Sequence, residues 1–350
     1  MGKVRRTGLA LVIGLLSTSA TAQQQPDPTN EEAVVATPAP AVQAATLPAP
    51  SATPATPAND PPPDSDVFLT SLDIPKQAVG TPKNITRREG YDNQPAFLND
   101  GSALLYVVGK DDATDIYRYD IATGLTTRVT RTDESEYSPT PLPDNRSFSA
   151  VRVAKPNAQG TDSTNPPVWR YGLDGKPGEQ LIDVTAVGYH AWLDPGHIAV
   201  FVVGDEAQNQ AHKLLLVDLN TGASTLLSEA PGRQLGRTPD RKRVSFVDKS
   251  DPKHWRVVAR AAGDDEPLFL VDTPRGPDEE KEEDRSEDYT WLPDGSLMMA
   301  KGNTLLRWDG RPGAGLKPFA TLENLGGDIK RLAVSKDGKQ LAFVVQLRRD

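Results

Sequence analysis

Short apolar runs recur along the chain from about residue 66 onward, and a polar turn precedes each of them. The recurring phrase is a small residue, an often aromatic residue, any residue, a Pro- or Asn-Asp-Gly turn and an apolar run. It reads PAFLNDGSALLYVV from Pro95 and YTWLPDGSLMMA from Tyr289. Asp-Gly between two apolar segments is a strong hairpin signal, because glycine accepts the positive φ that a tight turn requires. The pattern therefore predicts a series of antiparallel hairpins.

The phrase occurs six times at a regular interval. Its turns lie at Asp100, Asp144, Pro195, Asp240, Asp294 and Asp337. The spacings of about 43 to 54 residues are typical of propeller blades. A second pair of strand-like segments follows each hairpin, as at residues 115–120 and 127–129. Since four strands in each repeat make one blade, the sequence predicts an all-β fold of four-stranded antiparallel blades.

The two ends of the repeat region are incomplete in a complementary way. The sixth phrase stops near Val345 after two strands, whereas residues 66–73 and 82–86 resemble a third and a fourth strand. Pairing strands from both termini completes one blade and removes the sheet edges that a half-blade would expose. We therefore expect a six-bladed β-propeller over residues 66–350, closed by N- and C-terminal strands in one blade.

The repeats resemble those of a known family. The phrases PAFLNDGSALLYVV…DIYRYDIATG and TWLPDGSL are similar to the repeats of the TolB-like propeller family, which are related to WD40-like repeats, over about residues 66–346. The resemblance implies the fold, and the family includes TolB itself, propellers fused to peptidases, and enzymes. This chain departs from TolB in lacking the α/β domain that precedes its propeller, which counts against a role in Tol-Pal assembly.

The N-terminus has the three parts of a secretory signal peptide. Lys3, Arg5 and Arg6 precede the apolar residues 9–16, and an Ala20-Thr21-Ala22 site follows. The apolar run is too short to span a bilayer, which takes about 20 residues. We predict a signal peptide at residues 1–22, cleaved near Ala22, a periplasmic or secreted protein, and no transmembrane segment in the mature chain.

Composition adds three expectations. Residues 23–65 are rich in Pro, Ala and Thr without an apolar period, and this predicts a disordered linker. The absence of cysteine excludes disulfides, thiolate metal sites and a cysteine nucleophile. The net charge of -9 argues against nucleic acid as a partner, because phosphate binding requires clustered Lys and Arg. We expect a monomer.

Polar and aromatic residues precede each turn by a similar interval. If the blades align on their turns, these residues begin the innermost strands and meet at the mouth of the central funnel, as ligand sites do. The predicted ligand-binding residues are Asp92, Asn93, Glu136, Tyr137, Tyr189, His190, Glu287, Asp288 and Arg331. We assign Phe97, Trp192 and Trp291 to packing between blades, because large apolar side chains contribute most to burial.

Two functions are open at this point. We favour an envelope-associated propeller that binds a protein, peptide or glycan at the funnel mouth without catalysis and without a cofactor. The alternative is a lyase or hydrolase in which His190 acts as a base. In that alternative a divalent cation binds to carboxylates, here Asp92, Glu136, Glu287 and Asp288. The chain has no G-x-S-x-G elbow, P-loop or H-E-x-x-H motif, which favours the first interpretation.

Overall fold

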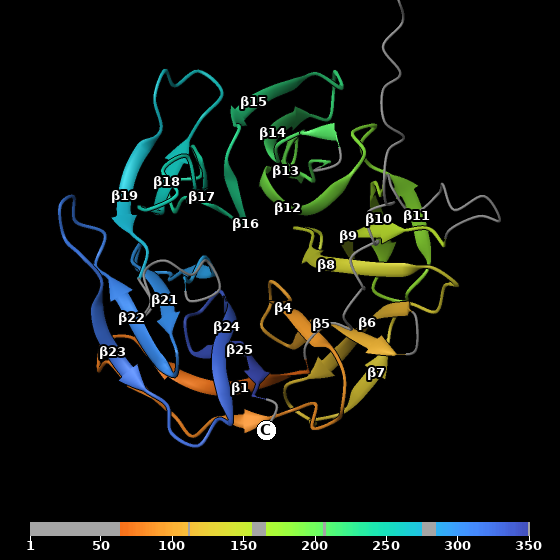
Figure 1. The fold of residues 1–350 in the computed structure, drawn as a ribbon. Helices are drawn as coiled ribbons and strands as arrows, with labels where there is room; N and C mark the ends of the chain where they lie inside the picture. Colours follow the sequence, from red (N-terminus) through yellow and green to blue (C-terminus); the bar gives the residue numbers. More distant parts are fainter. Residues whose placement is uncertain (1–63, 111–112, 156–165, 206–207, 275–284, 349–350) are drawn as a thin grey trace, which may run out of the picture. The chain divides into compact units, whose positions relative to one another are not determined.

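Six antiparallel sheets surround a common axis in the part of the chain that the structure describes (Figure 1). The computed structural model describes residues 64–110, 113–155, 166–205, 208–274 and 285–348. The predicted signal peptide and nearly all of the predicted linker lie outside these residues. The described residues contain no helix long and apolar enough to cross a membrane. The predicted fold, a six-bladed propeller, is confirmed.

Five blades are built from consecutive strands that run from the axis outward. Blades 1 and 2 consist of β4 (Asp92–Phe97), β5 (Ala103–Lys110), β6 (Ala113–Asp120) and β7 (Thr126–Arg128), then β8 (Ser135–Pro141), β9 (Ser147–Val153), β10 (Val168–Gly172) and β11 (Pro177–Gln180). Blades 3 to 5 consist of β12 (Val187–Asp194), β13 (His197–Val202), β14 (Lys213–Asp218) and β15 (Ser224–Ser228), then β16 (Pro231–Arg237), β17 (Val244–Asp248), β18 (Arg256–Arg260) and β19 (Leu268–Asp272), then β20 (Tyr289–Trp291), β21 (Leu297–Lys301), β22 (Thr304–Trp308) and β23 (Lys317–Thr321).

Blade 6 joins the two ends of the described chain. Its strands are β24 (Gly327–Val334), β25 (Gln340–Leu347) and β1 (Ser65–Asp73), with β2 (Ala78–Val79) and β3 (Lys83–Asn84) both paired to β1. Phe68 of β1 lies opposite Phe343 of β25, and their rings stack with centroids 5.6 Å apart. The predicted closure by N- and C-terminal strands is therefore confirmed. One detail differs, because the outermost position is divided between two short strands and this sheet has five.

The division of the outermost strand has a local cause. Between β2 and β3 lie Gly80, Thr81 and Pro82. Proline has no N–H to donate and glycine weakens a strand interior, so the pairing with β1 is interrupted there.

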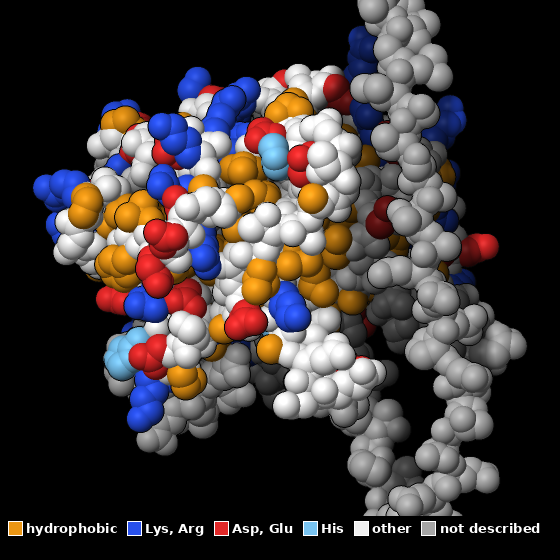
Figure 2. All heavy atoms as spheres, turned by 90° about the horizontal axis from the view of Figure 1, so that it is seen from above, with side chains coloured by type: hydrophobic (Ala, Val, Ile, Leu, Met, Phe, Trp, Pro, Cys, Tyr) orange, Lys and Arg blue, Asp and Glu red, His pale blue; other side chains and the backbone are white. Residues whose placement is uncertain are grey.

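The second strand of each blade is buried on both faces. All five residues of β17 are buried, as are five consecutive residues of β25. Neighbouring blades cover both faces of such a strand, which explains why the sequence has a continuous apolar run after each turn rather than an alternating one. On the outer side of the ring, hydrophobic side chains lie among Lys, Arg, Asp and Glu (Figure 2).

The innermost strands contact one another in a closed order around the axis. β4 contacts β8, β8 contacts β12, and the series continues through β16, β20 and β24 back to β4. The propeller thus brings one strand from every blade to the same central channel, and these six strands position the candidate site.

Truncation of the closing aromatic pair tests the importance of ring closure. Phe343→Ala removes a fully buried ring that stacks on Phe68, and we expect a loss of about 3–5 kcal/mol in the free energy of unfolding. Urea denaturation measures this loss. As a control, Leu125→Ala changes a side chain that is 66% exposed and should stay within about 0.5 kcal/mol of the parent. Equal midpoints for Phe343→Ala and the parent would contradict the proposed contribution of the pair.

Candidate functional site

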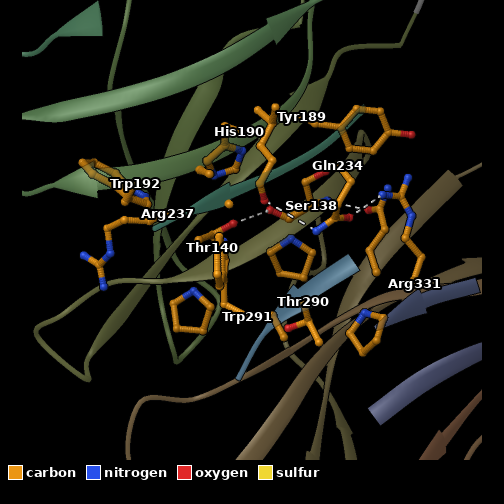
Figure 3. Close-up of a pocket in the computed structure, with 18 of the residues that line it drawn as sticks. Ser138, Thr140, Tyr189, His190, Trp192, Gln234, Arg237, Thr290, Trp291 and Arg331 are labelled. Atoms are coloured by element: carbon orange, nitrogen blue, oxygen red, sulfur yellow. Dashed lines mark hydrogen bonds between the residues drawn. The ribbon is translucent and has the colours of Figure 1, made fainter. Parts of the chain in front are cut away.

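Two cavities lie along the channel. The first has a volume of about 440 Å³ and is lined by the later residues of all six innermost strands, near their hairpin turns; we call it the turn-side cavity (Figure 3). The second has a volume of about 870 Å³ and is lined by residues near the starts of several innermost strands, by the end of β25 and by the segment between β17 and β18; we call it the start-side cavity. Tyr189, Arg233 and Arg331 line both cavities, so these three side chains lie where the two meet.

Backbone irregularities direct polar side chains into the channel. Gln94, Ser138 and Arg331 have positive φ values of 54°, 54° and 39°, and each lies at a shift of register with the second strand of its blade. A bulge of this kind turns a side chain away from its regular direction. The bulges of blades 1 and 2 also connect these two neighbouring blades, because the backbone amide of Ser138 donates a hydrogen bond to Gln94 Oε1 at 2.6 Å.

Arg331 links four blades at the junction of the cavities. Its Nη1 donates to Gln234 Oε1 at 3.1 Å and lies 3.2 Å from Asp288 Oδ1, while its guanidinium lies over the ring of Tyr189 at 4.8 Å (Figure 3). Burial pushes the pKa of Asp288 upward, but the cations Arg331 and Arg233 outweigh it and lower that pKa. Asp288 in turn raises the pKa of Arg331 against the effect of burial. Both groups are therefore charged.

A buried serine holds two side chains of the following blade. Ser149 Oγ of β9 lies 2.7 Å from His190 Nε2 and accepts the indole N–H of Trp192 at 2.9 Å. Ser149 is fully buried between blades 2 and 3. Since both bonds end at one fixed hydroxyl, they set the positions of His190 and Trp192 at the wall of the turn-side cavity.

The same arrangement occurs between blades 4 and 5. Ser245 Oγ of β17 accepts the hydroxyl of Tyr289 at 2.8 Å and the indole N–H of Trp291 at 2.9 Å. The sequence shows this repetition as H-A-W and Y-T-W at the same place in two phrases. Trp192 and Trp291 pack against hydrophobic clusters between blades, as predicted. They also line the cavity, and this second role was not predicted.

The predicted site residues fall into two groups. Six of them line the channel: Asn93, Glu287 and Asp288 the start-side cavity, His190 the turn-side cavity, and Tyr189 and Arg331 both. Asp92, Glu136 and Tyr137 line neither cavity, which differs from the expectation that all nine meet at one mouth. Alignment on the turns predicts the level of a residue along the channel, but successive strand residues point to opposite faces.

Asp92 and Glu136 are fully buried within the blades. Asp92 Oδ1 accepts from Arg88 Nε at 3.0 Å and Nη2 at 2.6 Å, and burial nevertheless raises its pKa to about 6. Glu136 Oε1 accepts from the hydroxyl of Thr132 at 2.5 Å, and burial raises its pKa as well. These carboxylates hold their own blades together rather than facing the channel.

The remaining titratable groups of the channel are poorly suited to act as a general base or to bind a cation. Burial lowers the pKa of His190 from 6.5 to about 3, so its imidazole is a weak base. Glu287 is paired with Arg233 at 2.7 Å and with Lys249 at 3.3 Å. Among the described residues no three His, Asp or Glu side chains form a group that would hold a metal ion. The arrangement is suited to binding a ligand by aromatic and guanidinium contacts.

Comparison with known proteins agrees with the fold. No protein family model and no curated protein matches the chain. Among solved structures, TolB from Acinetobacter baumannii is similar with a TM-score of 0.51 and 15% identity, over 81% of this chain and 64% of that one. A putative TolB from Agrobacterium tumefaciens has a TM-score of 0.59 and 12% identity, over 81% and 99% of the two chains.

An enzyme has a similar structure as well. A gluconolactonase from Xanthomonas campestris has a TM-score of 0.54 and 10% identity, over 82% of this chain and 99% of that one. The fold of this protein is therefore that of a TolB-like six-bladed β-propeller. This chain spans slightly less than two thirds of the Acinetobacter TolB, and at these identities the likeness shows the fold alone.

The neutral state of buried His190 predicts a pH-dependent stability. Its folded pKa lies below the ordinary value, so the unfolded chain takes up the proton first as the pH falls through 6.5. We expect this residue to lower the free energy of unfolding by up to about 1.4 kcal/mol per pH unit between pH 6.5 and about 4. His190→Gln should lack this component. Urea denaturation of both proteins at stepwise pH measures the difference in slope.

The comparison of the two proteins isolates the histidine. Asp92 and Glu136 act in the opposite direction in this range, since a raised carboxyl pKa favours the folded state at low pH. Both carboxyls are present in parent and variant, and their effect cancels. At pH 8 the two proteins differ in their free energy of unfolding through the loss of the hydrogen bond between His190 and Ser149. This difference is the reference for the lower pH values. Parallel curves from pH 8 to pH 4 would rule out a buried neutral His190.

Proposed function

We propose that this protein is an exported, envelope-associated propeller that binds a protein, peptide or glycan in its central channel without catalysing a reaction. The observation that carries the proposal is the turn-side cavity. All six blades contribute to it, its volume of about 440 Å³ lies in the range of small-ligand sites, and two half-buried indoles stand in its wall. Tryptophan at such a position offers a large rigid contact surface.

The channel chemistry supports binding over catalysis. A gluconolactonase with a similar fold shows that such a propeller can carry an enzyme, so the fold does not decide the function. In this chain burial lowers the pKa of His190 to about 3, and the channel carboxylates Glu287 and Asp288 face arginines. Neither group is arranged as a proton acceptor for a substrate.

Export and location rest on the sequence. The basic, apolar and small-residue segments of residues 1–22 support a signal peptide. The Pro-rich residues 23–65 support a spacer between the cleavage site and the propeller.

Substitution of one cavity tryptophan tests the binding site. We would screen the purified protein by thermal shift against a panel of short peptides and of neutral and acidic oligosaccharides, and measure each hit by calorimetry. Trp291→Phe should weaken binding of a hit about two- to tenfold, because it reduces the aromatic surface and removes the bond to Ser245.

The matched control is Trp169→Phe. Trp169 of β10 is also half-buried, and the guanidinium of Arg152 lies over its ring. It lines neither cavity, so its substitution should leave binding unchanged. Equal weakening by both substitutions would place the binding site elsewhere. Conversion of a hit to a new product during incubation would favour the enzyme alternative.

A further inference from the structure

The described lining of the turn-side cavity carries basic side chains and no acidic one. Its described lining includes Arg233, Arg237 and Arg331 and no Asp or Glu, although the whole chain has a net charge of -9. Cavity walls of low dielectric concentrate the field of such charges. Arg233 and Arg331 are paired with Glu287 and Asp288, which line the start-side cavity, so an anionic group in the turn-side cavity meets guanidinium groups without a carboxylate beside it.

Arg331 has unused donors where the cavity meets its neighbour. A guanidinium has five N–H groups, and only Nη1 of Arg331 has a hydrogen-bond acceptor and a nearby carboxylate among the described residues. Nε and Nη2 are not among the described side-chain atoms that are enclosed without a partner, so both remain open to the channel. The edge formed by Nε and Nη2 matches the two oxygens of a carboxylate.

The described lining of the turn-side cavity offers charged donors but no charged acceptor. The side-chain oxygens of Gln94 and Gln234 already accept from the Ser138 amide and from Arg331. Arginine and the indole N–H only donate, and no carboxylate is present in the described lining. The remaining acceptors of the lining are neutral, chiefly the hydroxyls of Ser138, Thr140 and Thr290, whereas its charged groups are all donors.

The apolar part of the lining suits a hydrophobic side chain. Trp192 and Trp291 stand in the wall together with four prolines, Pro95, Pro139, Pro141 and Pro143. Tyr189 and Gln234 both contact Arg331 where the turn-side cavity meets the start-side cavity.

We propose that the turn-side cavity binds the C-terminal residue of a peptide. The terminal carboxylate pairs with Nε and Nη2 of Arg331, and an apolar side chain lies against Trp192 and Trp291. This inference rests on the proposed binding function and names its ligand class, a peptide with a free C-terminus. It uses a recognised mode of peptide recognition, the capture of a terminal carboxylate.

Two peptide pools that differ only at the terminus test the inference. Both are fluorescein-labelled short peptides of the same composition with an apolar last residue; one ends in a free carboxylate and the other in a carboxamide. Fluorescence anisotropy should show about tenfold or tighter binding of the free acid, as expected for a charge-assisted hydrogen bond. Arg331→Gln should abolish this preference.

Two further variants keep the test interpretable. Arg331→Gln leaves the buried Asp288 without its partner and can unfold the protein, so the double variant Arg331→Gln, Asp288→Asn removes both charges together and should also bind acid and amide equally. Arg311→Gln is the matched control. Its arginine is 73% exposed at the side chain and pairs with Asp309 outside both cavities, and this variant should keep the full preference.

The outcomes separate the inference from the binding function. Equal binding of acid and amide by the parent, with both weakened by Trp291→Phe, would overturn the terminal carboxylate and leave the function standing. Binding of oligosaccharides instead of either pool would overturn the peptide class alone. Failure of peptides and oligosaccharides alike to bind would overturn both proposals.

Discussion

Backbone pairing between β1 and β25 joins strands from opposite ends of the described chain, and the channel depends on it. The cavity wall takes residues from six strands that touch only their neighbours around the axis. If blade 6 lost β1, the second strand of that blade would expose an edge and Phe343 would lose its stacking partner. The distance between β24 and β4, and with it the position of Arg331, is therefore set by a contact on the far side of its own blade.

Inside the closed ring, burial and ion pairing together determine the pKa values of the charged groups in and around the channel. Burial opposes the charged forms of Arg331 and Asp288, and their proximity favours both. Asp92, next to the channel-lining Asn93, and Glu136 lie inside the blades, where burial raises their pKa values. Four carboxylates that look alike in the repeats thus have two different environments, and only Glu287 and Asp288 contribute to the field of the channel.

The repeats predicted the fold because each blade is specified locally. The Asp-Gly turn and the doubly buried apolar run occur within about fifteen residues, and the incomplete ends show how the ring closes. The placement of residues along the channel could be predicted for some of them, whereas their role in binding remains a prediction. The turns place Tyr189, Asp288 and Arg331 at one level of the channel, as the structure shows. The bulges at Gln94 and Ser138 were not visible in the sequence, because neither residue is one that ordinarily signals positive φ. The bonds from Ser149 and Ser245 to side chains more than 40 residues away also lack a local signal.

The closing blade also affects the order of events during biosynthesis. A ribosome delivers β1 first and β25 last, so blade 6 can assemble only after the entire propeller sequence is available. Until then β1 has no partner strand at Phe68, and the first five blades form an arc with two open ends. Pairing over such a long sequence separation is slow. A chain with this topology remains an incomplete arc for as long as its last strand is withheld, and its unpaired strand edges stay accessible to other chains until the ring closes.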